Sequence, residues 1–161
     1  MRYFIILMVV FLSSCLSFKG ITIPTEVKTY YVEPVEIREL NAPAEISQVF
    51  METLRQKVRE QSKLIFDDSD PHVIFTPVIT KYSVNSVAPQ EGDLVAFNRL
   101  DISISISYED TKNEENDYTK TFNAFEDYPA NENFQDREEE LIATIFDDIT
   151  ERIFNDTFSD W

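Results

Sequence analysis

The sequence predicts an α+β fold: a two-layer sandwich in the order β-α-β-β-β-α, with two helices on one face of a mostly antiparallel four-stranded sheet. Apolar and polar residues alternate in several segments of the chain, which is the period of a strand with one buried face. Two other segments place apolar residues three and four positions apart, as amphipathic helices do. Because the alternating segments keep one polar face, antiparallel pairing with one face in water is expected.

The first half of the chain predicts one strand and one helix. Residues 21–37 are extended by pattern, with Pro24 and Pro34 as interruptions. Residues 43–62 form the helix, because Pro43 suits a first turn and apolar residues then recur at helical spacing. That apolar stripe consists of Ile46, Val49, Phe50, Leu54 and Val58. The short apolar run 64–66 leads into Asp67–Pro71, which is a turn by composition.

Three further strands are expected before the last helix. The alternation in residues 72–87 changes phase around Pro77, which predicts a β-bulge there. Residues 94–108 form the clearest predicted strand, because apolar and polar residues alternate strictly from Leu100 to Tyr108. Its apolar positions are Leu100, Ile102, Ile104, Ile106 and Tyr108. A polar loop at residues 110–117 then leads to a shorter strand at residues 118–125.

Residues 136–158 form the second predicted helix, with candidate caps in residues 131–135. Acidic residues crowd its first turns, where the helix dipole favours anions. Its stripe consists of Leu141, Ile142, Ile145, Phe146, Ile149, Ile153 and Phe154. We expect this stripe to cover the same sheet face as Ile102, Ile104 and Ile106.

The N-terminus, MRYFIILMVVFLSSC, has the pattern of a lipoprotein signal peptide. Its apolar run is shorter than the roughly 17 residues that span a bilayer as a helix. Leu12-Ser13-Ser14-Cys15 resembles a bacterial lipobox, so Cys15 is the predicted lipidation site. We therefore expect residues 1–14 to be removed, residues 15–19 to form a lipidated tether, and residues 20–161 to form one domain. The membrane is then reached through the lipid anchor.

Composition argues against several classes of function. The chain has 30 acidic and 14 basic residues and a net charge of −16, which disfavours nucleic acid as a partner. The single cysteine allows no disulfide within the chain and no cysteine-based metal site. His72 is expected at a strand edge, and the acidic run 67–70 lacks the glycine and distant glutamate of an EF-hand loop. The sequence thus predicts no cofactor, no metal and no catalytic residues.

Several short motifs, in their order along the chain, resemble the LptE family of lipopolysaccharide-assembly lipoproteins. They are residues 17–24 (SFKGITIP), residues 27–29 (VKT), residues 79–82 (ITKY) with Val84 and Val87, residues 98–100 (NRL), residues 153–155 (IFN) and Trp161. The resemblance covers nearly the whole chain after Cys15. It implies a two-layer sandwich that plugs the lumen of an LptD-like outer-membrane β-barrel. It also implies a periplasm-facing domain that helps to deliver lipopolysaccharide to the outer leaflet without catalysis.

Two other functions stay open on the residues alone: an unrelated transporter-accessory lipoprotein, and a lipid-anchored periplasmic hydrolase that uses paired carboxylates. For an interaction protein, the candidate interface is Val95, Phe97 and Arg99, at one end of the long strands. Exposed aromatic and arginine side chains together favour an interface centre. The alternative is that Val95 and Phe97 lie on a buried face. Direct contact with lipopolysaccharide also stays open, because the acidic surface opposes an anionic glycolipid.

Overall fold

The computed structural model describes residues 23–88 and 96–158. The predicted signal peptide, Cys15 and the predicted tether lie outside these residues, as does Val95. The strands are β1 (Thr29–Val32), β2 (Glu36–Ile37), β3 (Ile65–Phe66), β4 (Val73–Val87), β5 (Phe97–Asp110) and β6 (Tyr118–Pro129). The helices are α2 (Ile46–Gln61), a 3₁₀ turn η1 (Glu114–Asn116) and α3 (Phe134–Phe158).

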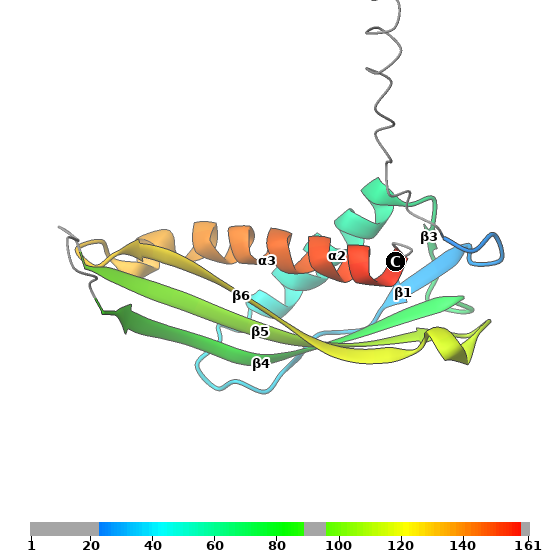
Figure 1. The fold of residues 1–161 in the computed structure, drawn as a ribbon, viewed down its shortest axis with the longest axis horizontal. Coiled ribbons are helices and arrows are strands. Elements are labelled where there is room, and N and C mark those ends of the chain that lie inside the picture. The colour runs from blue at the N-terminus through cyan, green and yellow to red at the C-terminus, as the bar shows by residue number, and fades with distance from the viewer. Residues whose placement is uncertain (1–22, 89–95, 159–161) are drawn as a thin grey trace, which may run out of the picture.

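The strands form one sheet in the order β3-β1-β4-β5-β6, with β2 also beside β4. Both helices lie over the same face of the sheet (Figure 1), and neither α2 nor α3 touches the other face. The predicted α+β sandwich is therefore confirmed. We call the face under the helices the inner face and the opposite one the outer face.

The sheet differs from the prediction in strand number and in the pairing of its first strands. It has six strands, and β1 runs parallel to both β3 and β4. The predicted strand at residues 21–37 is divided into β1 and β2, with Pro34 between them. Parallel pairing follows from the connection, because the chain crosses from β1 through α2 before it reaches β4. Alternation within a strand does not report the direction of its neighbour.

The predicted bulge is present in β4 but not at Pro77. The register against β5 shifts between Ile79 and Lys81, so Val73, Phe75, Pro77 and Ile79 all face inward. Pro77 fits a regular strand here, because β1 pairs with β4 only up to Phe75 and β2 begins at Val78. Its missing N–H therefore faces the gap between β1 and β2, where no partner needs it.

The core lies between the inner face and the two helices. Ile102, Ile104 and Ile106 are fully buried, as are Ile149 and Ile153 of α3, which confirms the predicted facing stripes. The two helices also meet each other through Phe50 and Phe146, whose rings pack edge to face at 5.0 Å. Lys57 of α2 reaches Glu151 of α3 at 3.1 Å.

Local hydrogen bonds explain the turn that precedes β6 and the start of the helix that follows it. Asp110 is buried, and its carboxylate accepts hydrogen bonds from the backbone of Lys112 and Asn113 and from the Asn116 side chain. This satisfied carboxylate fixes the turn into β6. The strand extends to Pro129, beyond the predicted end at Phe125. The Asn133 side chain then accepts a bond from the Gln135 N–H, as an N-cap does, so α3 begins at Phe134.

Candidate partner-binding surface

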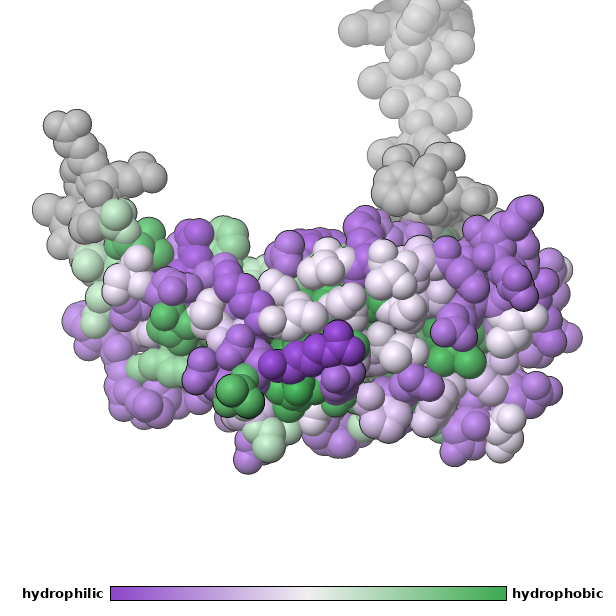
Figure 2. All heavy atoms as spheres, turned by 90° about the horizontal axis from the view of Figure 1, so that it is seen from below, coloured by the Kyte–Doolittle hydropathy of each residue, from purple (hydrophilic) through white to green (hydrophobic). Residues whose placement is uncertain are grey.

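The outer face of the sheet is not part of the hydrophobic core of the described residues. Its central residues on β5 and β6 are hydroxyl and amide side chains: Ser103, Ser105, Ser107, Thr119, Thr121 and Asn123. Ser107 and Thr119 are hydrogen-bonded to each other at 2.9 Å. Figure 2 views the molecule from this side and shows mostly hydrophilic and weakly polar residues, with scattered apolar ones. With strands of 15, 14 and 12 residues, this is a long, polar, open surface.

Near one end of the outer face, aromatic and charged side chains gather around Arg99. The guanidinium donates two hydrogen bonds to the Asp127 carboxylate, at 2.7 and 2.9 Å. Its central carbon also lies 3.7 Å from the centre of the Phe125 ring. Phe125 is 51% exposed and Phe97 is 38% exposed. We call Phe97, Arg99, Phe125 and Asp127 the distal cluster.

The structure places two of the three predicted interface residues in this cluster. Phe97 and Arg99 are both on the outer face, so for Phe97 the buried alternative is wrong. Val95 lies outside the described residues. Phe125 and Asp127 were missed by the sequence reasoning, which ended the last strand at residue 125. They join Arg99 only through the register of β5 against β6, which pairs Arg99 with Asp127 and Asp101 with Phe125.

The charges of the cluster are mutually satisfied. The hydrogen bonds from Arg99 lower the pKa of the Asp127 carboxyl, and the same bonds raise the pKa of Arg99. The pair therefore remains ionised across the physiological range. The exposed Phe125 ring lies against a guanidinium that is already paired with Asp127, and this arrangement suits recognition by contact instead of proton transfer.

The other sequence candidates have structural roles. His72 Nδ1 accepts a hydrogen bond from the backbone N–H of Lys28. Asp67 accepts from the N–H groups of Ser69 and Asp70, as expected for the predicted turn. Glu138 accepts a hydrogen bond from the Tyr82 hydroxyl. The pKa of Tyr82 is raised, mainly by burial and to a smaller extent by this hydrogen bond. Residues 23–88 and 96–158 contain no group of three His, Cys, Asp or Glu side chains that could hold a metal ion.

One hollow in the described structure lies beside the residues that precede β1. It has a volume of ≈ 790 Å³ and lies between the residues before β1 and the end of α2. Ile23, Val27 and Leu64 supply apolar walls, and Lys28 and Lys63 supply charge. Glu60 is the one carboxylate among its described lining residues, so this hollow does not show the carboxylate pair of a hydrolase. Among the described helices, none is both long and apolar enough to cross a bilayer.

The fold and this surface define a class: a small α+β domain with a covered inner face and a wide polar outer face, without a metal cluster in its described part. The Lipopolysaccharide-assembly (LptE) family model matches residues 27–157. The chain belongs to the LptE family. It is thus a cell-envelope lipoprotein of lipopolysaccharide assembly, and the family is non-enzymatic.

Solved structures show the same fold at low sequence identity. A minor lipoprotein from Acinetobacter baumannii is 13% identical, with a TM-score of 0.51 over 79% of this chain and 90% of that one. An uncharacterized lipoprotein B from Nitrosomonas europaea is 14% identical, with a TM-score of 0.51 over 84% of this chain and 88% of that one. No curated protein sequence matches the chain.

Proposed function

We propose that this lipopolysaccharide-assembly lipoprotein plugs the lumen of an LptD-like outer-membrane β-barrel and helps to deliver lipopolysaccharide to the outer leaflet without catalysis. In this proposal signal peptidase removes residues 1–14, and lipid on Cys15 holds the domain at the periplasmic leaflet of the outer membrane. Family membership supports the assembly role, the polar outer face supports the plugging role, and the lipobox-like segment before Cys15 supports the location.

The observation that carries the proposal is the uncovered polar outer face. A barrel lumen is lined by polar side chains, so a plug must present a large hydrophilic surface instead of an apolar patch. Rows of serine, threonine and asparagine along β5 and β6 supply such a surface, because hydroxyl and amide groups can both donate and accept hydrogen bonds. The distal cluster adds two exposed rings at one end of it.

The chain's route gives the plug a direction. Ile23 is eight residues after Cys15, so an extended tether reaches roughly 28 Å at most. The start of β1 therefore stays near the periplasmic leaflet. β4 begins beside β1 and runs away from it for 15 residues, roughly 50 Å. The distal cluster, at the far end of the paired strands, then points into the barrel.

Lipopolysaccharide itself is anionic, and the chain carries a net charge of −16. Direct contact between them therefore requires divalent cations or a basic barrel wall to offset the repulsion. The hollow beside α2 is lined by one carboxylate among its described residues, that of Glu60, whereas a glycoside-type hydrolase needs two.

The test is the Phe97→Glu substitution in the lipidated chain, produced together with its barrel. Burial of a new charge at an interface centre should weaken association by about tenfold or more, because aromatic anchors dominate such interfaces. Phe97 is on the open face, so the melting temperature should stay at the parental value. Thr144→Glu, on the exposed side of α3, adds the same charge and serves as the control.

The measurement is the amount of barrel recovered per amount of lipoprotein. Parental recovery with Phe97→Glu would remove the distal cluster from the interface. Equal losses with Thr144→Glu would attribute the effect to net charge instead of position.

A further inference from the structure

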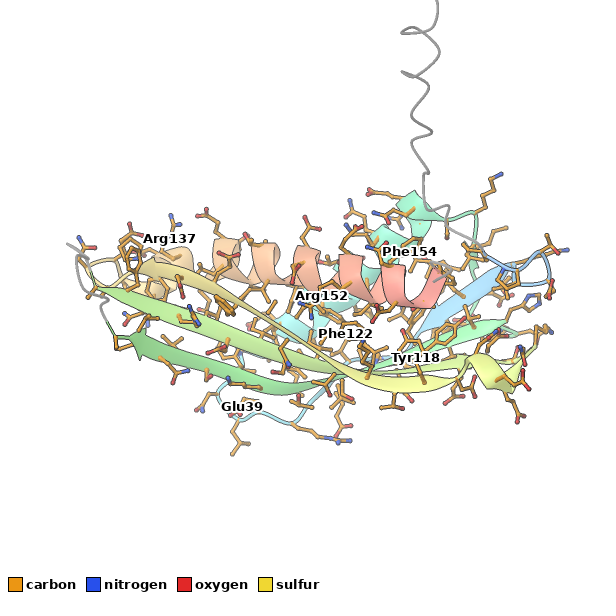
Figure 3. The ribbon with its side chains drawn as sticks, viewed as in Figure 1. Glu39, Tyr118, Phe122, Arg137, Arg152 and Phe154 are labelled. Atoms are coloured by element: carbon orange, nitrogen blue, oxygen red, sulfur yellow. The ribbon has the colours of Figure 1, made fainter. Side chains whose placement is uncertain are left out.

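The sheet has an open edge along the second half of β4. On the side away from β5, β4 pairs with β1 through Phe75 and with β2 through Ile79. The last bond on this side is donated by the Arg38 N–H to the Ile79 carbonyl, at 3.0 Å. The chain then leaves the sheet in the loop that carries Glu39, seen below β4 in Figure 3. No described strand continues beside β4 beyond this point.

The hydrogen bonds show which backbone groups point to this edge. Phe75 and Ile79 face inward, and the carbonyls of both accept bonds from the β1–β2 side. In a strand, side-chain direction and backbone direction alternate together. After the bulge the inward positions become Tyr82, Val84 and Ser86, which pair across β5 with Ile102, Leu100 and Asn98. The N–H and C=O groups of these three residues therefore point away from β5, into the open edge.

The opposite edge of the sheet is protected, which makes the β4 edge distinctive. Along β6, the Asn123 carbonyl accepts a hydrogen bond from the Arg152 side chain of α3, at 2.9 Å. Lys120 of the same strand forms an ion pair with Asp156 of α3. Charged side chains of this kind are how proteins usually blunt an edge strand. Within the described residues, no side chain binds the backbone N–H and C=O groups of Tyr82, Val84 and Ser86 that point into the open edge.

The side chains along the β4 edge also suit an incoming strand. Residues 82–87 carry no charge, and Val84 is 41% exposed although it faces inward. Two valines and small polar residues allow close backbone approach. Backbone groups that point into the open edge occur at every second residue, roughly 6.7 Å apart. An extended peptide has backbone groups at the same spacing.

We infer that residues Tyr82–Ser86 of β4 bind an extended segment of the barrel partner by strand addition. This inference rests on the proposed plug function and names the backbone that would make the contact. Main-chain hydrogen bonds provide affinity in this mode of recognition. Three N–H and three C=O groups are available, one pair on each inward-facing residue.

Two observations favour a barrel segment over a second copy of this chain. Each copy carries a net charge of −16, so two copies side by side repel each other. The tether also places the start of β4 near the membrane, and Tyr82 lies nine residues further along the strand, roughly 30 Å away. In the plug arrangement, that distance puts the edge inside the lumen, beside the barrel wall and away from the lipid anchor.

Residue-resolved amide hydrogen exchange tests the inference directly. In the lipidated chain alone, the amides of Tyr82, Val84 and Ser86 should exchange quickly, whereas those of Ser83 and Asn85, which face β5, should exchange slowly. In the purified complex with the barrel, all five should exchange slowly. Unchanged rates for Tyr82, Val84 and Ser86 in an intact complex would overturn the strand-addition inference and leave the plug proposal standing.

Two substitutions at Val84 supply a second measurement. Val84→Pro removes an N–H that faces the open edge, so no hydrogen bond within the domain is lost. It should weaken association with the barrel by about tenfold. Val84→Thr keeps the N–H and a similar shape, and it should associate as the parent does. Equal association of the two variants would contradict the inference. If Val84→Pro lowers the melting temperature, Val84→Lys is used in its place, because a charged side chain protects a strand edge from pairing.

Two further outcomes also decide the matter. If the parent chain forms no complex with the barrel, both the plug proposal and this inference fail. If the chain alone is a dimer, and its Tyr82, Val84 and Ser86 amides are already protected, the edge belongs to a second copy and the inference is wrong.

Discussion

Two single substitutions at adjacent residues of β5 should show which face of the sheet is buried and which is exposed to water. Ile104 is fully buried and lies between Ile79 of β4 and Phe122 of β6. Ser105, the next residue, faces outward between Val78 and Thr121. We predict that Ile104→Asp unfolds the domain or nearly does so, whereas Ser105→Asp has little effect.

The magnitude follows from burial. Loss of a fully buried isoleucine side chain costs about 2–5 kcal/mol. An unpaired carboxylate in the same place adds several kcal/mol more, because neither neighbour can donate a hydrogen bond. A domain of this size has a free energy of unfolding of only about 5–15 kcal/mol, so Ile104→Asp removes most of it. Ser105→Asp leaves its carboxylate in water and should change the free energy of unfolding by about 0.5 kcal/mol.

Urea unfolding of the mature chain, followed by circular dichroism, measures both free energies. The Cys15→Ser background avoids detergent, and the parent in the same background is the reference. Coincident transitions for Ile104→Asp and the parent would refute the assignment of the faces. So would a loss of several kcal/mol in Ser105→Asp.

Three other predictions follow from single features of the molecule. Cys15→Ala should abolish incorporation of a fatty-acid analogue in metabolic labelling, and undiminished label would contradict lipidation at Cys15. Tyr82→Phe removes the hydroxyl that donates to Glu138, so the free energy of unfolding should fall by about 1.5 kcal/mol, with an unchanged urea midpoint as the contrary result. Hydrogen bonds from Arg99 and from Gln61 lower the pKa values of Asp127 and Glu151 in the folded state. Their contribution to stability is therefore complete above the ordinary carboxyl pKa, near 4, and is lost as the pH falls through their lower folded values. Urea midpoints between pH 7 and pH 3 should show a smaller acid loss in Asp127→Asn than in the parent.

The sequence predicted the helices and the long strands well, because their apolar residues have one dominant period. The helical stripe that includes Ile149 and Ile153 has one clear period, and so has the alternation through Ile102, Ile104 and Ile106. Their packing follows, since each has one face to bury.

The short elements and the pairing could not be predicted in the same way. β2 and β3 have two residues each, too few for any period to appear. Pro77 suggested an irregularity in the strand. Its nitrogen faces a gap in the sheet, where no N–H is needed, and the bulge lies three residues further on. Parallel pairing of β1 depends on the crossover through α2, which no local pattern encodes.

Only part of the distal cluster could be predicted from the sequence. Phe97 and Arg99 could be singled out because an aromatic and an arginine are uncommon on a polar strand face. Phe125 and Asp127 became visible only when the β5–β6 register placed them beside Arg99. The open β4 edge depends on where β2 stops, so the sequence pattern of β4 alone gives no sign of it.

The most direct test of the account is the mass of the native lipoprotein complex, purified gently from outer membranes and measured by native mass spectrometry. The account predicts a one-to-one complex with a single large β-barrel protein, and it predicts that the complex persists when bound lipopolysaccharide is removed. Recovery of the lipoprotein from the outer membrane without any barrel, under conditions that keep other envelope complexes intact, would contradict it.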